Sequence, residues 1–286
     1  MYLAIVYNTR SGSKKQKLTK EFFTEKFSSI NHELFFWNEK NPIEDIEKLI
    51  LIKKFTHVVA AGGDGTVNRI GMFVSKHDLT LGIIPLGSGN GFARSLNISI
   101  QPTEAVNQIV NGTSKKIDSA YINDKKFFCT AGLGFDAHIG KLFSTNTKRG
   151  FWSYFKITLK ELLFYRPASY QIATENKKFE TKAFLITVCN AGQWGNDIYI
   201  DYGAQVNDGI LSLVIVKPFP VYAIPRLALL LFQKKIQRSR YVETYRGRNF
   251  SVSATEQMTT HFDGEPNEEL TKVTFRVNAA DLNVLC

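Results

Sequence analysis

Alternation between short apolar runs and helix-like segments dominates the first 110 residues and most constrains the fold. The apolar runs predict strands at "YLAIVYN" (2–8), "HELFFW" (32–37), "HVVAAGG" (57–63) and at the start of "LTLGIIPLGSGNGFARSL" (79–96). Helices are expected between them, from about Lys14 to Phe27 and over 43–55, where Ile43, Ile46, Leu49 and Ile50 share one face. Strands that alternate with helices predict a parallel sheet with helices on both faces.

Three glycine-rich or polar loops follow strands of this predicted sheet: "NTRSGS" (8–13), "GGDGT" (62–66) and "PLGSGNG" (85–91). The carboxyl ends of parallel strands form one edge, which is where such sheets bind ligands. Glycines allow close backbone approach, and a helix N-terminus attracts phosphate. Thr66 or Asp64 is expected to cap the helix that begins here. One such loop could equally be a tight turn without a ligand, but three on one edge favour phosphate binding.

A different pattern begins near residue 115. Alternating β-branched segments with Asp-Gly and Asn-Asp turns predict a β-rich second domain, a sandwich. We therefore expect domains at 1–115 and 116–286, with the C-terminal end able to pack back on the first domain. Two basic, aromatic helical segments, 147–167 and 225–241, interrupt the strands. Core packing is the default explanation for the first, and the second is the better candidate for membrane contact.

The charge is +10, from 36 basic and 26 acidic residues, which favours anionic partners or simply a solvated basic surface. Nucleic acid is not expected, because no RNP-like, zinc-finger or basic heptad motif is present. Three isolated cysteines argue against a disulfide framework and for a reducing compartment. The N-terminal apolar run is short and lacks a basic leader, and no window reaches ~18 apolar residues. These features predict a cytoplasmic protein.

Five motifs in a fixed order resemble the diacylglycerol kinase catalytic-domain family, which includes sphingosine and ceramide kinases and soluble bacterial lipid kinases. They are "GGDGTVN" (62–68), "PLGSGNGFARSL" (85–96), "TAGLGFDA" (130–137), "NDGILSLVIV" (207–216) and "HFDGEP" (261–266). The resemblance covers nearly the whole chain. It implies a first domain like those of NAD kinases and phosphofructokinases, which share the GGDGT loop, and an active site between the two domains.

The resemblance also implies an ATP site on the three loops and after the second strand. Its residues would be Asn8, Asn38, Gly62, Gly63, Asp64, Gly65, Thr66, Val67, Asn68, Ser88 and Asn90. A magnesium ion would accompany ATP, with Asp64 as an outer contact. The chain departs from the family at Thr9, where a proline is usual, and at Arg69, where many relatives have glutamate. Arg69 could aid ATP binding or pack outward.

The "FDGE" motif would supply the acids, with Glu265 as catalytic base and Asp263 as its acidic partner. An extended backbone would place both on one side, whereas Asp-Gly alone favours a hairpin turn. The family's structural magnesium site matches "QVNDGIL", where the carboxylate of Asp208 and the carbonyls of Gln205 and Ile210 would ligate the ion. A simple Asp-Gly turn is again the alternative.

The resemblance implies an ATP-dependent kinase of phospholipid biosynthesis, which transfers the γ-phosphate to a hydroxyl of diacylglycerol or a related lipid. It would contact the membrane peripherally to reach this lipid substrate. Two alternatives are an NAD kinase-like enzyme and a non-catalytic nucleotide- or lipid-binding regulator. Arg69 supports the regulator, whereas retention of both acids in "FDGE" opposes it. A homodimer is left open.

Overall fold

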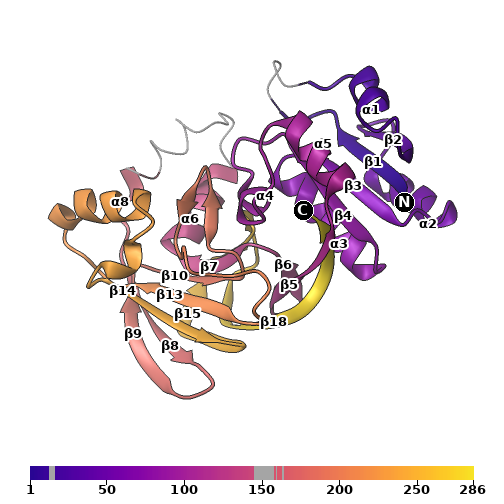
Figure 1. The fold of residues 1–286 in the computed structure, drawn as a ribbon. Coiled ribbons are helices and arrows are strands. Elements are labelled where there is room, and N and C mark those ends of the chain that lie inside the picture. Colours follow the sequence, from indigo (N-terminus) through magenta and orange to yellow (C-terminus); the bar gives the residue numbers. More distant parts are fainter. Residues whose placement is uncertain (13–16, 145–157, 159, 163) are drawn as a thin grey trace. The chain divides into compact units, whose positions relative to one another are not determined.

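The computed structural model describes residues 1–12, 17–144, 158, 160–162 and 164–286 (Figure 1). Most of the basic, aromatic segment 147–167 lies outside the described residues. Contacts divide the chain into two compact units. Unit 1 comprises Met1–Asp118, Gly195–Asp197 and Ala279–Cys286, and unit 2 comprises Ser119–Trp194 and Ile198–Asn278.

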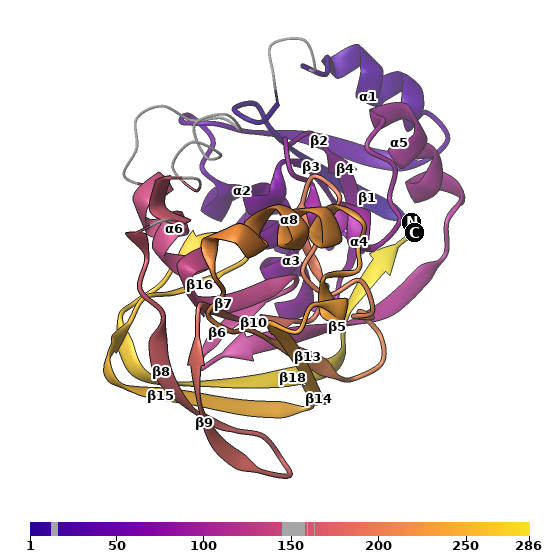
Figure 2. The ribbon, with the colours of Figure 1, turned by 90° about the vertical axis from the view of Figure 1, so that its left-hand side faces the viewer.

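Unit 1 is built on a parallel sheet in the order β2-β1-β3-β4, extended by the end of β18. Its strands are β1 (Tyr2–Asn8), β2 (Asn31–Trp37), β3 (His57–Gly62), β4 (Thr80–Pro85) and the last residues of β18 (Leu270–Leu285). Its helices are α1 (Lys20–Lys26), α2 (Ile43–Ile52), α3 (Asp64–Lys76), α4 (Gly91–Ser95) and α5 (Pro102–Asn111). Figure 2 shows α1 and α5 on one side of this sheet and α2 and α3 on the other. The predicted α/β architecture is confirmed.

Two helix boundaries differ from the sequence prediction. Residues 17–19 are not helical, and α1 begins at Lys20 because the side chain of Thr19 accepts a hydrogen bond from the Phe22 amide and caps the helix. The predicted helix is therefore not found over residues 17–19, and its predicted start near Lys14 lies outside the described residues. α2 ends at Ile52, and Leu49 is exposed instead of facing the core.

Unit 2 is a sandwich of two antiparallel sheets. One contains β9, β8, β15 and the first part of β18, and the other has the order β14-β13-β10-β7-β16-β17. Their bounds are β7 (Thr130–Gly134), β8 (Ala168–Ala173), β9 (Lys178–Ala183), β10 (Leu185–Cys189), β13 (Leu211–Val216), β14 (Val242–Gly247), β15 (Asn249–Met258), β16 (Thr260–Phe262) and β17 (Glu265–Pro266). Buried side chains from both sheets, such as Val252 and Leu213, form one core. The predicted sandwich is confirmed.

Shorter elements complete the chain. They are β5 (Ser114–Ile122), β6 (Lys125–Phe127), β11 (Gln193–Gly195), β12 (Ile198–Tyr199), α6 (Phe135–Ser144), α8 (Ile224–Phe232) and the 3₁₀ turns η2 (Val221–Ala223) and η3 (Ile236–Arg238). None of the helices in the described part of the chain has both the length and the apolar character needed to cross a bilayer.

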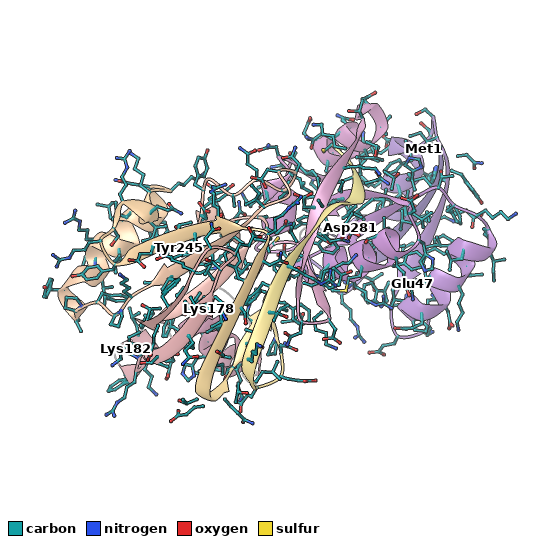
Figure 3. All side chains as sticks on the ribbon, turned by 90° about the horizontal axis from the view of Figure 1, so that it is seen from below. Met1, Glu47, Lys178, Lys182, Tyr245 and Asp281 are labelled. Carbon is teal, nitrogen blue, oxygen red and sulfur yellow. The ribbon has the colours of Figure 1, made fainter. Side chains whose placement is uncertain are left out.

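The C-terminal residues 279–286 belong to unit 1. Asn283 and Val284 pair in parallel with β4. Just before them, Ala280 has a φ of +53° and its amide donates to the Asp118 carboxylate at 2.8 Å. Asp281, labelled in Figure 3, accepts a hydrogen bond of 2.7 Å from Ser75 on α3. The far end of the sequence thus completes the N-terminal sheet.

Candidate active site

The GGDGT loop forms the junction between β3 and α3. β3 ends at Gly62, and the helix begins at Asp64 with Gly63 as its N-cap, where no side chain supplies a capping hydrogen bond. The expectation that Thr66 or Asp64 caps α3 is therefore wrong, since both lie inside the helix. This uncapped end of a 13-residue helix carries the positive pole of the helix dipole, which suits an anion.

The three predicted loops meet at this point. Asn8 donates from its side-chain amide to the Thr66 hydroxyl at 2.9 Å, and the Ser11 hydroxyl lies 3.3 Å from the same oxygen. The amide of Gly63 donates to Ser11 Oγ at 3.3 Å. On the other side, the Leu86 amide donates to the carbonyl of Gly62 at 2.7 Å. The predicted convergence of these loops on one sheet edge is confirmed.

Close approach of two backbones explains the glycines at this edge. A Cβ atom on Gly63 would lie 3.3 Å from the Cα of Gly87, and one on Gly87 would lie 2.8 Å from the Cα of Gly63. Both distances are shorter than ordinary packing allows. The contact between the two loops thus favours glycine at both positions. This reason is separate from the approach of a phosphate that the sequence suggested.

Asp64 holds the third loop in place. Its two carboxylate oxygens accept the amides of Asn90 at 2.8 Å and Gly91 at 2.7 Å, so that Asp64 caps α4 instead of α3. Burial raises the pKa of the Asp64 carboxyl, and these backbone donors oppose that rise. Asn90, at a φ of +50°, closes the loop by exchanging two hydrogen bonds with the backbone of Gly87.

The other predicted nucleotide residues have different surroundings. Gly65 and Ser88 are exposed, and Asn68 is half-buried. Val67 is buried, which leaves only its backbone for a ligand. Asn38 caps its own turn by accepting the amides of residues 40 and 41.

A pocket of about 320 Å³ lies beside Asn38. It is lined by Arg10, Asn38, Glu39 and Lys40. Arg10 pairs with Glu39 and belongs to the first loop, whose Thr9 amide donates to the Trp37 carbonyl. The sequence analysis missed Arg10 and Lys40, although Arg10 stands inside the quoted "NTRSGS" loop. Of these two cations, Arg10 is paired with Glu39, and Lys40 is exposed.

Arg69, the departure from the family pattern, points to α2. Its guanidinium lies 2.8 Å from the carboxylate of Glu47 and 3.6 Å from that of Glu44. Of the two roles left open for Arg69, outward packing is the one found. The one sequence feature that supported a decayed site therefore has a structural explanation within unit 1.

In unit 2, the "FDGE" motif forms a tight hairpin between β16 and β17. Asp263 and Gly264 have φ values of +46° and +83°, and Phe262 pairs with Glu265 across the turn. The extended backbone that would place Asp263 and Glu265 on one side is therefore wrong. The turn, favoured by the Asp-Gly pair itself, is correct.

The two acids of this hairpin have different surroundings. The carboxylate of Asp263 accepts three backbone amides, from Phe128 at 2.8 Å, Cys129 at 2.7 Å and Thr130 at 3.1 Å. Glu265 is exposed and carries no such contacts within the described residues. Asp263 thus holds the hairpin in place, whereas the side chain of Glu265 faces solvent.

A buried polar cluster supports the same hairpin from the other side. Asp136, at the start of α6, accepts the Thr187 hydroxyl at 2.8 Å and lies 3.0 Å from Nε2 of His261 on β16. Nδ1 of His261 is buried and has no hydrogen-bond partner among the described residues. The sequence analysis missed this pair, although Asp136 and His261 stand inside two of the quoted motifs.

The predicted magnesium loop is occupied by protein contacts. One oxygen of Asp208 accepts the amide of Ile210 at 3.0 Å, and the other lies 3.8 Å from the guanidinium of Arg246. Arg246 also lies 3.9 Å from the buried carboxylate of Asp201. Oxygen ligands from Gln205, Asp208 and Ile210 would suit magnesium in type, but Arg246 already supplies the positive charge. The arrangement does not fit an open cation site.

Comparisons with known proteins agree with this fold. The family model "Diacylglycerol kinase catalytic domain" matches residues 2–122, and "YegS C-terminal NAD kinase beta sandwich-like domain" matches residues 129–286. A diacylglycerol kinase of Bacillus subtilis (strain 168) is 26% identical over 91% of this chain and 88% of its own. A Citrobacter koseri protein named "Probable lipid kinase YegS-like" is 30% identical over 73% of this chain and 71% of its own.

A crystal structure of a diacylglycerol kinase from Bacillus anthracis str. Sterne has the same fold, with a TM-score of 0.73 at 19% identity, over 99% of this chain and 96% of the other. Fold and loops thus define an α/β and β-sandwich protein of the lipid-kinase class. The chain belongs to the diacylglycerol kinase catalytic-domain family, with a second domain of the YegS type.

Proposed function

We propose that this protein transfers the γ-phosphate of ATP to a hydroxyl of a membrane lipid, with diacylglycerol as the first candidate acceptor. The observation that carries the proposal is the meeting of three loops at the uncapped N-terminus of α3. Gly63, Ser11 and Thr66 there combine backbone amide, hydroxyl and helix dipole in one place. Such an arrangement suits the phosphates of a nucleotide.

The residues of unit 1 would hold ATP. The backbone of Gly63 to Thr66 would face the phosphates, and the side chains of Asn8 and Thr66 would add polar contacts. Arg10 and Lys40 line the neighbouring pocket and would balance negative charge. A magnesium ion that arrives with the nucleotide would neutralise phosphate oxygens, with Asp64 as the proposed outer contact.

Glu265 would act on the acceptor. Its carboxylate is exposed on a hairpin that Asp263 anchors to the backbone at the start of β7 and that His261 anchors to α6, so it can be presented in a defined position. The lipid hydroxyl oxygen would attack the γ-phosphorus, the bond from that phosphorus to the bridging oxygen would break, and ADP would leave. Glu265 would orient the hydroxyl and take its proton.

The acceptor class comes from the relatives. The Bacillus subtilis relative is named a diacylglycerol kinase, and the Citrobacter koseri relative a lipid kinase. Phosphorylated diacylglycerol is a precursor class for phospholipids, which would place this reaction in phospholipid biosynthesis. Because ATP is a cytoplasmic substrate and the acceptor resides in a bilayer, the enzyme would work at the cytoplasmic membrane surface.

The test is transfer of labelled γ-phosphate from ATP to a panel of acceptors: diacylglycerol, sphingosine and ceramide in mixed micelles, and NAD in solution. Diacylglycerol should be the best acceptor. Glu265→Gln should lower kcat by about 10²–10⁴-fold with little change in the KM for ATP. Glu268→Gln, the same chemical change on an exposed neighbour, should leave kcat unaltered.

Two results would overturn the proposal. Phosphorylation of NAD, with no lipid product, would make the protein an NAD kinase. A Glu265→Gln variant with the parental kcat on the best acceptor would remove Glu265 from the mechanism.

A further inference from the structure

Helix α8 is apolar on nearly every side, and yet none of its residues is buried. Its sequence is "IPRLALLLF", with Arg226 as the one charged residue. A helix that is apolar all round is normally buried in a core. Here Leu227, Leu230 and Leu231 pack on a core cluster of unit 2 that includes Val216 and Val242. The opposite side of the helix is left to solvent.

The exposed side runs from η2 through α8 and includes Arg226. Exposed positions fall at 221 and 222, 225 and 226, 229, and 232 and 233, a spacing of three to four residues that keeps them on one side of a helix. We define the α8 face as its large side chains, which are Val221 (63% exposed), Tyr222 (78%), Leu229 (56%) and Phe232 (68%). Contiguous exposed apolar surface of this kind marks an interaction site.

Basic residues lie within α8 and directly after it in the sequence. From residue 218 to residue 241 there is no aspartate or glutamate, whereas Arg226, Lys234, Lys235, Arg238 and Arg240 all fall in this stretch. Within the described part of the chain, no carboxylate pairs with Arg226, Lys235 or Arg238. Lys234 lies over the rings of Tyr199 and Tyr202, and Tyr202 is itself exposed. The rim is therefore positive and partly aromatic.

We propose that the α8 face docks this protein on a bilayer that contains anionic phospholipid, with the helix lying in the plane of the interface. Apolar side chains below a basic rim are the features of an interfacial helix, and tyrosine and cationic side chains favour the headgroup level. The charge also argues against a second copy of this chain as the occupant, because a symmetric contact would bring two basic rims together. This inference rests on the proposed function in one respect: docking would give the enzyme access to a lipid acceptor.

Figure 1 shows α8, in orange, at the outer edge of unit 2, close to β14. Three residues after the end of α8, η3 begins and supplies Arg238. Lys235 immediately precedes η3. The apolar face and the cations thus come from one short stretch, 221–240. A lipid surface could be reached by this stretch without rearrangement of the sandwich core.

The experiment is sedimentation of the whole protein, without ATP, with vesicles of phosphatidylcholine containing 30% phosphatidylglycerol or none. We expect binding to the anionic vesicles and much weaker binding to the neutral ones. Leu229→Gln with Phe232→Gln should weaken binding by about tenfold, by removing the inserted side chains. Lys235→Gln with Arg238→Gln should weaken it by about 30-fold at low salt and less at high salt.

Matched controls change the same chemistry elsewhere. Ile52→Gln removes a 73% exposed apolar side chain from α2, and Lys178→Gln with Lys182→Gln removes two exposed cations from β9 (Figure 3). Both should bind vesicles like the parent. Equal thermal unfolding of all variants would show that each one is folded.

Activity separates this inference from the proposed function. On a short-chain diacylglycerol dissolved as monomers, the α8 variants should keep the parental kcat/KM and lose activity only on vesicle-embedded acceptor. Vesicle binding by a protein that phosphorylates no lipid would overturn the proposed function and keep the docking surface. Parental vesicle binding by both α8 variants would overturn the docking surface. A parent that is dimeric in solution and α8 variants that are monomeric would also overturn it, because the occupant of the face would then be a second copy.

Discussion

Gly63 shows how a single residue links the fold to the proposed chemistry. Its φ of −86° is accessible to any residue, so its identity is not a matter of backbone strain. What requires glycine is the nearby Cα of Gly87, which a Cβ would approach to 3.3 Å. The same residue donates its amide to Ser11 and occupies the N-cap position of α3, where no side chain caps the helix. A change at Gly63 would therefore disturb two loops of the phosphate-binding edge together.

Gly63→Ala is the sharpest test at this scale. The added methyl group must push the two loops apart by a few tenths of an ångström. Isothermal titration calorimetry should show a loss of ATP affinity of about tenfold. Overpacking should also lower the free energy of unfolding by about 1 kcal/mol. Gly140→Ala is the control, because a Cβ there would meet nothing within 4 Å and helix propensity should be slightly improved. Unchanged ATP affinity in Gly63→Ala would contradict the assignment of this edge.

Among the elements, the β16–β17 hairpin is the one whose geometry matters most for the proposed reaction. It is short, and an isolated hairpin of this size would not be stable. Asp263 anchors its turn by three backbone hydrogen bonds, and His261 anchors its first strand to Asp136. Glu265 can hold a defined position only because these neighbours hold the hairpin.

Asp263→Ala should therefore lower the free energy of unfolding by about 3 kcal/mol, because three amides lose a charged acceptor. Asp263→Asn should lower the free energy of unfolding by less, since asparagine keeps one acceptor oxygen and tolerates the positive φ. Urea denaturation measures both. Asp124→Ala, at a largely exposed aspartate, should change stability by less than about 0.5 kcal/mol. Equal losses for Asp263→Ala and Asp124→Ala would show that the anchoring contacts are unimportant.

The loop at 201–210 gives a second prediction at the element scale. Since Arg246 faces both Asp201 and Asp208, the melting temperature of the parent should be the same in EDTA and in magnesium without nucleotide. Arg246→Ala would uncover the two carboxylates, and magnesium should then raise the melting temperature by about 2–4 °C, roughly 1 kcal/mol for a protein of this size. If magnesium raised the melting temperature of the parent, and Asp208→Asn removed this effect, the result would instead support the metal site expected from "QVNDGIL".

At the scale of the whole molecule, the chain closes unit 1 with its own C-terminus. Residues 279–286 supply Leu282, Val284 and Leu285, which are at most 3% exposed, and pair with β4. Unit 1 therefore depends on residues that follow the entire second unit in the sequence. Native contacts of such long sequence separation form late and are entropically expensive to close.

Truncation after residue 278 tests this dependence. Losing three buried aliphatic side chains should remove about 4.5–9 kcal/mol, at about 1.5–3 kcal/mol each, which is comparable to the total stability of a typical domain. We expect the truncated protein to lose ATP binding and to show an early unfolding transition by calorimetry. Replacing only Cys286 with serine is the mild control. A truncated protein with the parental melting profile and ATP affinity would show that unit 1 is complete without this segment.

The sequence alone determined the α/β and sandwich architecture and the loop edge, and its Asp-Gly pair favoured the turn found in the "FDGE" motif. Each of these depends on periodicity or on backbone preferences within a few residues, and such information is local. Only the tertiary structure decided that Asp64 caps α4, that Arg69 pairs with Glu47, that Asp263 binds the amides of residues 128–130 and that Arg246 faces Asp208. The partners in these contacts are 22 to 135 residues apart. Side chains of this kind have several satisfactory partners in a chain of this composition, and folding selects the one that the packed backbone brings within reach.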